Sequence, residues 1–144
     1  MLVQQILKSK GDSGVITVTG DTPVSDAAQI LAERRIGGLV VSPDGEAVEG
    51  ILSERDIVRS LAVRGTSCMT ETVSEMMTRN PVCCSKNDSS DAVLTRMTDG
   101  RFRHMPVVED GKLVGIVTIG DVVKARLEEL SMEKSALEGM IMGY

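Results

Sequence analysis

Aromatic side chains are almost missing from this chain of 144 residues. It has no Trp, and Phe102 and Tyr144 are its single Phe and Tyr. Proteins that bind single-stranded nucleic acid stack the bases on aromatic rings, so the composition disfavours that function. The formal net charge of −5 at pH 7 disfavours nucleic acid in general, because such affinity comes largely from cationic side chains. We therefore expect no nucleic-acid partner.

Long apolar runs are missing as well. No stretch approaches the roughly 20 consecutive apolar residues that a membrane-spanning helix needs. The N-terminal segment MLVQQILKSKG also lacks the uninterrupted apolar core of a secretion signal. From these two observations we expect a cytoplasmic protein with no membrane partner.

The chain has few residues suited to covalent or metal chemistry. Its three cysteines, Cys68, Cys83 and Cys84, are an odd number without a C-x-x-C pair, and we expect reduced thiols that pack in the core. His104 is the single histidine, and with Cys83 or Cys84 it forms the only thiol–imidazole pair that the sequence offers. The sequence has no dedicated cluster of metal ligands. We expect neither an enzyme nor a catalytic cofactor.

What the sequence does contain is an internal repeat. The heptapeptide GILSERD (50–56) returns as GIVTIGD (115–121), 65 residues later. The similarity extends over residues 25–59 and 90–124, which both open with Ser-Asp-Ala, and a one-residue gap in each copy keeps them in register. Internal similarity at a fixed spacing indicates a fold built from copies of one unit.

Each copy predicts the same order of elements. A short β-branched run (15–18; 81–84) precedes a helix that the Ser of Ser-Asp-Ala (Ser25; Ser90) would cap. Two strands joined by an Asp-Gly turn follow. A second helix then covers residues 54–64 or 119 to about 138. Because a β-α-β-β-α unit of roughly 60 residues has only marginal stability alone, the two copies should pack on each other in an α/β (α+β) fold.

We expect three segments along the chain. The polar stretch 64–72 separates the repeats, which gives a first domain (1–68), a second domain (69–130) and a C-terminal helical tail (131–144). Around the start of the tail, apolar residues recur at helical spacing at Leu127, Leu130, Leu137 and Ile141. They either pack on their own domain or form a dimer contact.

The heptapeptide has a structural and a functional interpretation. Ser53 and Thr118, each followed three residues later by an acid, are typical of a capping box at the start of a helix. A capping box favours Glu or Gln, whereas both copies have the shorter Asp (Asp56; Asp121). A strand-to-helix turn presents backbone N–H groups to a phosphate, and a nearby carboxylate can accept the hydroxyls of a ribose. This combination indicates a nucleoside phosphate site.

Basic side chains accompany both heptapeptides. Arg55 and Arg59 share one face of the predicted helix, and Lys124 is the second-copy equivalent of Arg59. These cations either bind phosphate or are solvated surface charges.

These features resemble a tandem pair of cystathionine-β-synthase domains (CBS domains), whose hallmark is G-h-x-[S/T]-x-x-D after a hairpin. The hallmark stands at Gly50, Ser53, Asp56 and at Gly115, Thr118, Asp121. The resemblance covers the chain from about Leu2 to about Leu130. It implies two units packed as a pseudo-twofold pair with clefts between them, a disc-like homodimer of such pairs, and a ligand that contains adenosine: AMP, ADP, ATP, S-adenosylmethionine or NAD(H).

The resemblance also implies roles for single residues, through segments such as MTRNPV and RHMPVV. The predicted nucleotide-binding residues are Asp56 and Asp121 for the ribose; Ser53 and Thr118 for phosphate or ribose; Thr78, Asn80 and Val82 for the base; Arg55, Arg59, Arg103, His104 and Lys124 for phosphate; Met105 and Pro106 for the apolar wall; and Gly120 in the second heptapeptide. The equivalent wall of the first copy is Leu39, Val40 and Val41. That copy departs from the family pattern at Val40, where the family often has Pro, and in its entry KGDSGVITV. The two sites should therefore differ in ligand or affinity.

The leading hypothesis is a stand-alone regulatory protein. It would bind AMP, ATP, NAD or NADH in the cleft between the repeats and signal to an unidentified partner protein, since the repeats and the tail account for the whole chain. The alternative is an interaction or dimerisation scaffold, held together by apolar faces and a methionine-rich tail, without physiological nucleotide binding.

Overall fold

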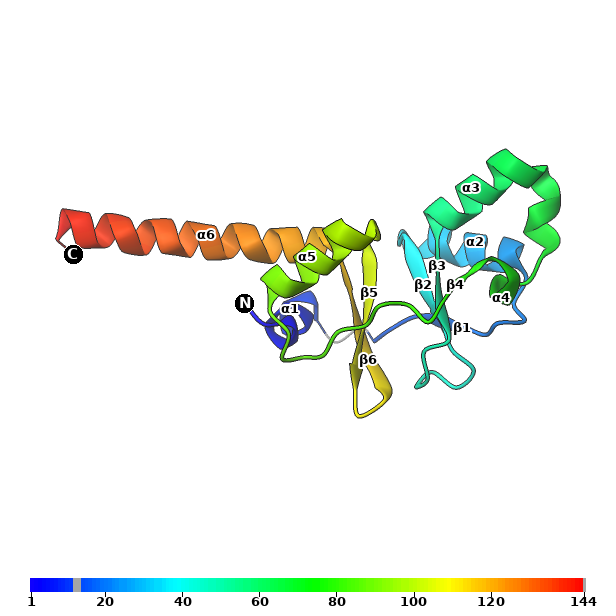
Figure 1. Cartoon of the computed structure of the whole chain (residues 1–144), viewed down its shortest axis with the longest axis horizontal. Helices are drawn as coiled ribbons and strands as arrows, with labels where there is room; N and C mark the ends of the chain where they lie inside the picture. Colours follow the sequence, from blue (N-terminus) through cyan, green and yellow to red (C-terminus); the bar gives the residue numbers. More distant parts are fainter. Residues whose placement is uncertain (12–13, 144) are drawn as a thin grey trace.

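A computed structural model describes residues 1–11 and 14–143 (Figure 1). Asp12 and Ser13, from the predicted entry of the first repeat, and Tyr144, from the predicted tail, lie outside the described residues. In chain order the elements are α1 (Val3–Lys10), β1 (Thr17–Val18), α2 (Val24–Arg34), β2 (Gly38–Val41), β3 (Gly50–Ser53), α3 (Glu54–Arg64), the 3-10 helix η1 (Gly65–Thr70), α4 (Val73–Met76), β4 (Thr78–Arg79), α5 (Ser90–Gly100), β5 (His104–Glu109), β6 (Lys112–Thr118) and α6 (Ile119–Met142). The predicted α/β class with two repeated units is confirmed.

The first unit is built on a four-stranded sheet in the order β1-β2-β3-β4. Strand β1 runs parallel to β2, whereas β3 is antiparallel to both β2 and β4. Strand β4 comes from the start of the second repeat and pairs Thr78 with Ile51 and Arg79 with Gly50. The second repeat therefore begins on the sheet of the first.

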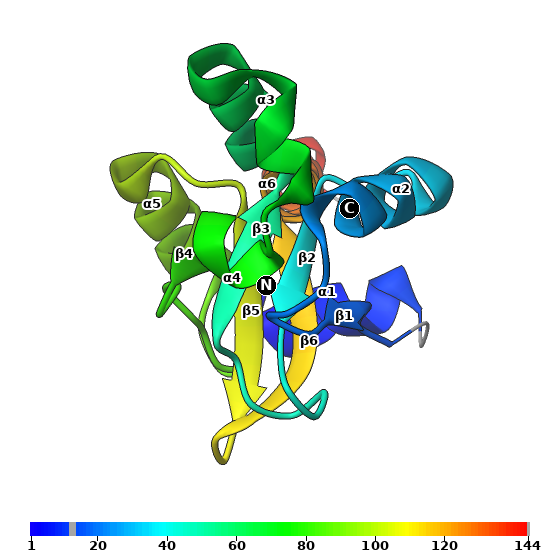
Figure 2. The same ribbon diagram turned by 90° about the vertical axis from the view of Figure 1, so that its right-hand side faces the viewer.

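The second unit contains the two-stranded antiparallel sheet β5-β6, with an irregularity between Val107 and Val108. The strand predicted at 81–84 is reduced to one parallel bridge from Cys84 to Val107. This bridge is the second-copy equivalent of the β1–β2 pairing of Val18 with Val41. Seen along the long axis of the molecule, the two sheets lie one in front of the other (Figure 2).

The helices after the first strands start differently from the prediction. Ser89, rather than Ser90, caps α5, because its Oγ accepts a hydrogen bond of 3.1 Å from the Ala92 N–H. The Ser90 side chain is buried and donates to Glu129 instead. In the first copy, α2 begins after Pro23, which leaves Ser25 inside the first turn.

The two units exchange the helices that precede them. Val3 and Ile6 of α1 pack in the core of the second unit, whereas Val73 of α4 packs in the core of the first. Backbone hydrogen bonds fix each exchange, for example from Val3 N to Asp88 O (2.9 Å). Each core is thus completed by a segment from the other repeat. The proposed domain boundary at residue 68 remains a prediction based on position in the sequence.

Helix α6 is one continuous helix through the predicted boundary at residue 130. Its first turns contribute Val122 and Ala125 to the second core. Its remaining length extends away from both sheets (Figure 1), and residues 131–138 and 140–143 are all exposed.

Candidate functional site

Both heptapeptides form the capping box that their sequence predicts. Asp56 Oδ2 accepts hydrogen bonds from Ser53 N (2.9 Å) and Ser53 Oγ (3.0 Å), while Ser53 Oγ accepts from Asp56 N (3.2 Å). Thr118 and Asp121 make the corresponding two backbone bonds at 2.9 and 3.2 Å. The shorter Asp therefore reaches the N-cap, and each box places one carboxylate where a strand gives way to a helix.

One cleft opens beside Asp56, with a volume of about 290 Å³. We call it the Asp56 cleft, and its lining residues are Ile51, Ser53, Arg55, Asp56, Arg59, Thr78, Asn80, Pro81, Val82, Gly100, Arg101, Phe102, Arg103 and His104. The first repeat contributes the start of α3, and the second contributes its entry segment and the start of β5. Nine of the predicted site residues therefore meet in one place, although they come from two distant parts of the sequence.

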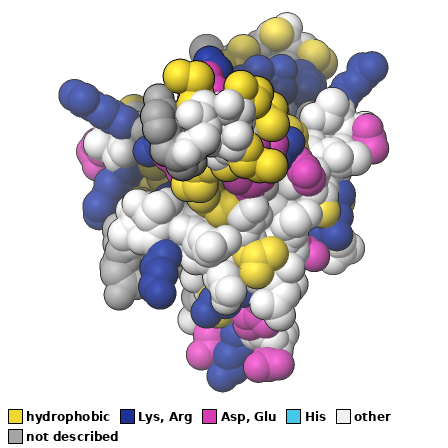
Figure 3. All heavy atoms as spheres, turned by 90° about the vertical axis from the view of Figure 1, so that its left-hand side faces the viewer, with side chains coloured by type: hydrophobic (Ala, Val, Ile, Leu, Met, Phe, Trp, Pro, Cys, Tyr) yellow, Lys and Arg dark blue, Asp and Glu magenta, His cyan; other side chains and the backbone are white. Residues whose placement is uncertain are grey.

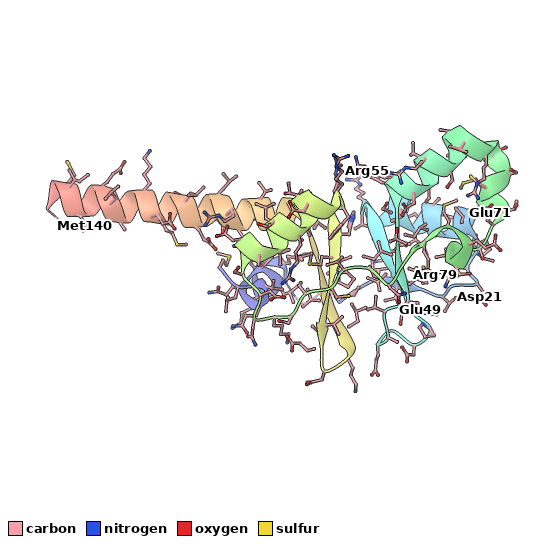
Figure 4. The ribbon with its side chains drawn as sticks, viewed as in Figure 1. Asp21, Glu49, Arg55, Glu71, Arg79 and Met140 are labelled. Atoms are coloured by element: carbon pink, nitrogen blue, oxygen red, sulfur yellow. The ribbon has the colours of Figure 1, made fainter. Side chains whose placement is uncertain are left out.

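The Asp56 cleft is strongly basic. Four exposed arginines line it, and among the described residues none of them forms an ion pair with a carboxylate: Arg55, Arg59, Arg101 and Arg103. Figure 4 shows Arg55 in the region where the two units face each other. Such a set of guanidinium groups around a helix N-terminus suits an anion with several oxygens, above all a phosphate.

Sequence reasoning missed Arg101 in this set. Arg101 ends α5 in the left-handed conformation with φ 57°, and Arg35 ends α2 in the same way with φ 55°. The alignment of the two repeats pairs these residues, but only the fold brings Arg101 to a carboxylate 45 positions earlier in the chain.

A second cleft, of about 430 Å³, opens at the start of α6. We call it the Asp121 cleft after the carboxylate beside it, and its lining residues are Leu7, Lys10, Gly11, Gly14, Val15, Ile16, Arg35, Ile36, Gly37, Gly38, His104, Val114, Gly115, Ile116 and Thr118. Of the predicted residues, only Thr118 and His104 lie in its lining. Asp121 itself is engaged by Lys10, whose Nζ lies 2.8 Å from Asp121 Oδ2 and also donates to the carbonyl of Ile116.

This ion pair changes the acidity of Asp121. Partial burial favours its protonated form, but the hydrogen bonds from Lys10 and from the Thr118 backbone outweigh burial and hold the pKa of Asp121 below its ordinary value. The carboxylate predicted to bind a second ribose is therefore charged and already occupied by a cation of the same chain.

His104 forms the wall that both clefts share. Its ring lies against Gly38, the residue that occupies the equivalent position in the first repeat, and a Cβ on Gly38 would come within 2.9 Å of His104 Cδ2. Burial lowers the pKa of His104, and the neighbouring Glu54 only partly opposes this effect. At neutral pH His104 is therefore an uncharged hydrogen-bonding group rather than a cation for phosphate.

Besides Asp121, four predicted residues line neither cleft. Met105 and Pro106 are buried behind the start of β5, and Met105 belongs to the core of the second unit. Gly120 and Lys124 lie exposed on α6. The first-copy wall behaves in the same way, since Leu39, Val40 and Val41 are fully buried. The two sheets use these apolar side chains for their cores, and the cleft walls come from strand ends and connecting segments instead.

Cys83 and Cys84 lack the properties of a nucleophile. Cys84 is buried, and burial raises its pKa to about 12; burial also raises the pKa of Cys83. Because the thiolate is the reactive form, both side chains are protonated at neutral pH. In the part of the chain that the structure describes, no group of three or more His, Cys, Asp or Glu side chains is placed to hold a metal ion.

None of the helices in residues 1–11 and 14–143 combines the length and the apolar character that crossing a membrane requires.

Known proteins share this architecture. The crystal structure of the CBS-domain containing protein ATU1752 from Agrobacterium tumefaciens superimposes with a TM-score of 0.83 at 44% identity, over 88% of this chain and 99% of that one. The CBS domain pair of protein MJ0100, in complex with 5′-methylthioadenosine and S-adenosyl-L-methionine, superimposes with a TM-score of 0.77 at 28% identity, over 90% of this chain and 98% of that one.

Sequence comparison gives the same result. The CBS domain-containing protein CBSX3, mitochondrial, of Arabidopsis thaliana is 34% identical over 148 residues, which span 98% of this chain and 72% of that protein. Since that relative is named mitochondrial, the cytoplasmic location expected for the present chain remains a prediction. The family model of the CBS domain matches two tandem segments, residues 11–63 and 73–128. The chain therefore belongs to the CBS domain family, as a tandem pair of CBS domains.

Proposed function

We propose that this CBS domain pair is a regulatory protein without catalytic activity that binds one adenosine nucleotide in the Asp56 cleft. The observation that carries the proposal is the convergence of one capping-box carboxylate and four arginines on a cleft of about 290 Å³ between the two repeats. A carboxylate suits ribose hydroxyls, and guanidinium groups suit phosphate.

Each part of the ligand has a counterpart in the cleft. Both bonds from Ser53 go to Oδ2 of Asp56, which leaves Oδ1 to accept a ribose hydroxyl. Thr78 and Asn80 line the part of the cleft that we assign to the base, and Val82 supplies an apolar contact to its face. The phosphates extend toward the arginines at the opening.

Adenosine is the favoured nucleoside. The MJ0100 domain pair, 28% identical to this chain, is described with two ligands that both contain adenosine. The four arginines favour a ligand that also carries phosphate, so we infer AMP, ATP, NAD or NADH rather than a thioether of adenosine. An unidentified partner protein then recognises the nucleotide-bound form of this chain.

Equilibrium titration by calorimetry tests this function. We expect AMP, ATP, NAD or NADH to bind with a dissociation constant in the millimolar range or below, at one molecule per chain, and to raise the melting temperature. Two compounds are the controls: the corresponding cytidine nucleotide shares the ribose and the phosphates but not the base, and inorganic triphosphate shares only the phosphates. Equal binding of all compounds would reduce the cleft to a general anion site, and no binding of any would reject the proposal.

A scaffold function is the second candidate, and one observation favours it. Helix α6 exposes large apolar side chains that line neither cleft. If the purified protein binds none of the nucleotides yet associates with itself or with a partner, the scaffold replaces the sensor.

A further inference from the structure

The Asp56 cleft continues onto the outer surface of helix α3. A second and more open hollow, of about 410 Å³, lies there. We call it the α3 hollow, and its lining residues are Glu54, Arg55, Val58 and Arg59. Arg55 and Arg59 also line the Asp56 cleft. Two cations therefore stand on the border between the nucleotide cleft and a neighbouring space that a single nucleoside does not fill.

The spacing of the four lining residues along α3 makes them one patch. Glu54 and Val58 are four residues apart and lie on the same side of the helix. Arg55 and Arg59 have the same spacing and lie next to them. A hydrogen bond of 2.9 Å from the Glu54 N–H to the Gly37 carbonyl fixes the start of the helix. The α3 hollow thus presents a carboxylate and an apolar side chain beside two guanidinium groups.

Val58 is the apolar part of the α3 hollow, and 64% of it is exposed. Most of the other large exposed apolar side chains belong to α6, and Figure 3 shows hydrophobic side chains gathered around the free end of that helix. Val58 differs from them because arginines accompany it. Arginine side chains stack on flat rings and also bind phosphate. The surroundings of Val58 therefore suit a ring that is joined to a phosphate group.

The charge of Glu54 limits what can enter the α3 hollow. Glu54 is exposed, and it forms no ion pair with any residue that the structure describes. A phosphate chain that passed the two arginines and ended in the hollow would place its terminal charge beside this carboxylate. A carboxylate repels such a charge, whereas it accepts hydrogen bonds from the hydroxyls of a ribose. The hollow thus suits a nucleoside better than a free phosphate end.

We propose that the Asp56 cleft and the α3 hollow together bind a dinucleotide, in which a phosphate chain joins two nucleosides. This inference rests on the proposed function, because the first nucleoside occupies the Asp56 cleft. The chain lies along Arg55 and Arg59, and the second nucleoside lies on Val58 with its ribose at Glu54. A single phosphate group carries at most about two negative charges, so the four arginines of the cleft also favour a chain of phosphates.

Calorimetric titration with four nucleotides tests the proposal. AMP and ATP contain one nucleoside, NAD contains two joined by two phosphates, and diadenosine tetraphosphate contains two joined by four. We expect at least one of the two dinucleotides to bind about tenfold more tightly than both AMP and ATP, because the second nucleoside covers Val58. The affinities of NAD and diadenosine tetraphosphate then show which chain length fits.

The same titration separates this proposal from the proposed function. If AMP or ATP binds and neither dinucleotide binds more tightly, the α3 hollow is not a nucleoside site, although the Asp56 cleft remains a nucleotide site. If none of the four compounds binds, both are rejected.

A variant of Val58 locates the second nucleoside. Val58→Asn removes the apolar contact without a change of charge, so it should weaken dinucleotide binding about tenfold and leave the affinity for AMP unchanged. Val63→Asn is the matched control: this residue is 79% exposed on the same helix and lines neither the cleft nor the hollow, so its substitution should change neither affinity. Circular dichroism verifies that both variants fold. Equal losses for AMP and the dinucleotide, or equal effects of the two variants, would overturn the proposal.

A variant of Glu54 tests the selection by charge. Glu54→Gln should strengthen the binding of ATP about fivefold, because the carboxylate that faces its terminal phosphate is gone, and it should leave the affinity for AMP unchanged. An unchanged affinity for ATP would overturn the role of Glu54 in excluding a free phosphate end.

Discussion

The Asp56 cleft and the Asp121 cleft start from the same heptapeptide pattern and differ in what surrounds it. Both Asp side chains cap a helix with nearly equal hydrogen bonds. Asp56 then faces four arginines that have no carboxylate partner in the described part of the chain, whereas Asp121 is paired with Lys10 at 2.8 Å. A duplicated motif thus repeats its local structure, while its neighbours decide whether the carboxylate is available to a ligand.

The exchanged lead helices explain this difference. Leu2 and Thr72 make equivalent bridges, to Ser89 and Pro23, so the two lead segments correspond at an offset of 70 residues. At that offset Asn80 stands where Lys10 stands. Asn80, with φ 46°, lines the Asp56 cleft, but Lys10 ends a longer helix and reaches Asp121.

The largest expected effect concerns the two aspartates. Asp56→Asn should weaken nucleotide binding about a hundredfold, because hydrogen bonds to a charged acceptor contribute about 1.5–3 kcal/mol each. Asp121→Asn removes the same capping-box carboxylate from the other repeat and should change the dissociation constant less than threefold. Calorimetric titration of both variants measures the contrast. Equal losses would mean that the two clefts act as equivalent sites.

The wall between the clefts gives the next effect. Gly38→Ala should destabilise the fold by about 1–3 kcal/mol, since the new Cβ would press on the His104 ring in a packed interface. Gly37→Ala, whose Cβ would lie 3.3 Å from the same ring, should cost less. Urea unfolding measures both. Combining Gly38→Ala with His104→Ala should recover part of the loss, and no recovery would show that another contact is responsible.

Releasing Asp121 should make the two clefts more alike. Lys10→Met removes the ammonium group that occupies the carboxylate, and we expect about a tenfold gain in affinity of the Asp121 cleft for adenosine, seen as a second binding event in calorimetry. Lys8→Met, on the same helix but exposed and away from the carboxylate, is the control. An unchanged single event in both variants would indicate that Lys10 is not what closes this site.

The smallest effect is the pH dependence of the Lys10–Asp121 pair. Because the folded pKa of Asp121 lies below its ordinary value of 3.8, the pair stabilises the fold at higher pH, and this contribution is lost as pH falls through the folded pKa. Its size should be under about 1 kcal/mol, since the pair is partly exposed. Urea unfolding between pH 6 and pH 2 should therefore show a flatter profile for Asp121→Asn than for the wild type, and identical profiles would contradict the assignment.

Local sequence signals predicted much of this protein. The repeat, the Asp-Gly turn at 110–111 and the two capping boxes depend on contacts within a few residues, and each has the expected geometry. The strand at 81–84 and the caps at Ser25 and Ser90 were wrong, because sheet pairing and burial of Ser90 outweigh local preference there. The sequence also left open whether Leu127, Leu130, Leu137 and Ile141 pack on their own domain, and the structure shows that all four are exposed.

By itself the sequence determined that two similar units exist and that each carries one carboxylate at the start of a helix, since periodicity and capping are encoded over short stretches of chain. Only the tertiary structure decided which partners those carboxylates meet. The contacts that separate the clefts join residues far apart in the chain, such as Lys10 with Asp121 and Asp56 with Arg101 around one cleft. The contact of Lys10 with Asp121 arises because each unit completes its core with a helix from the other repeat, and no local pattern in the sequence records that exchange.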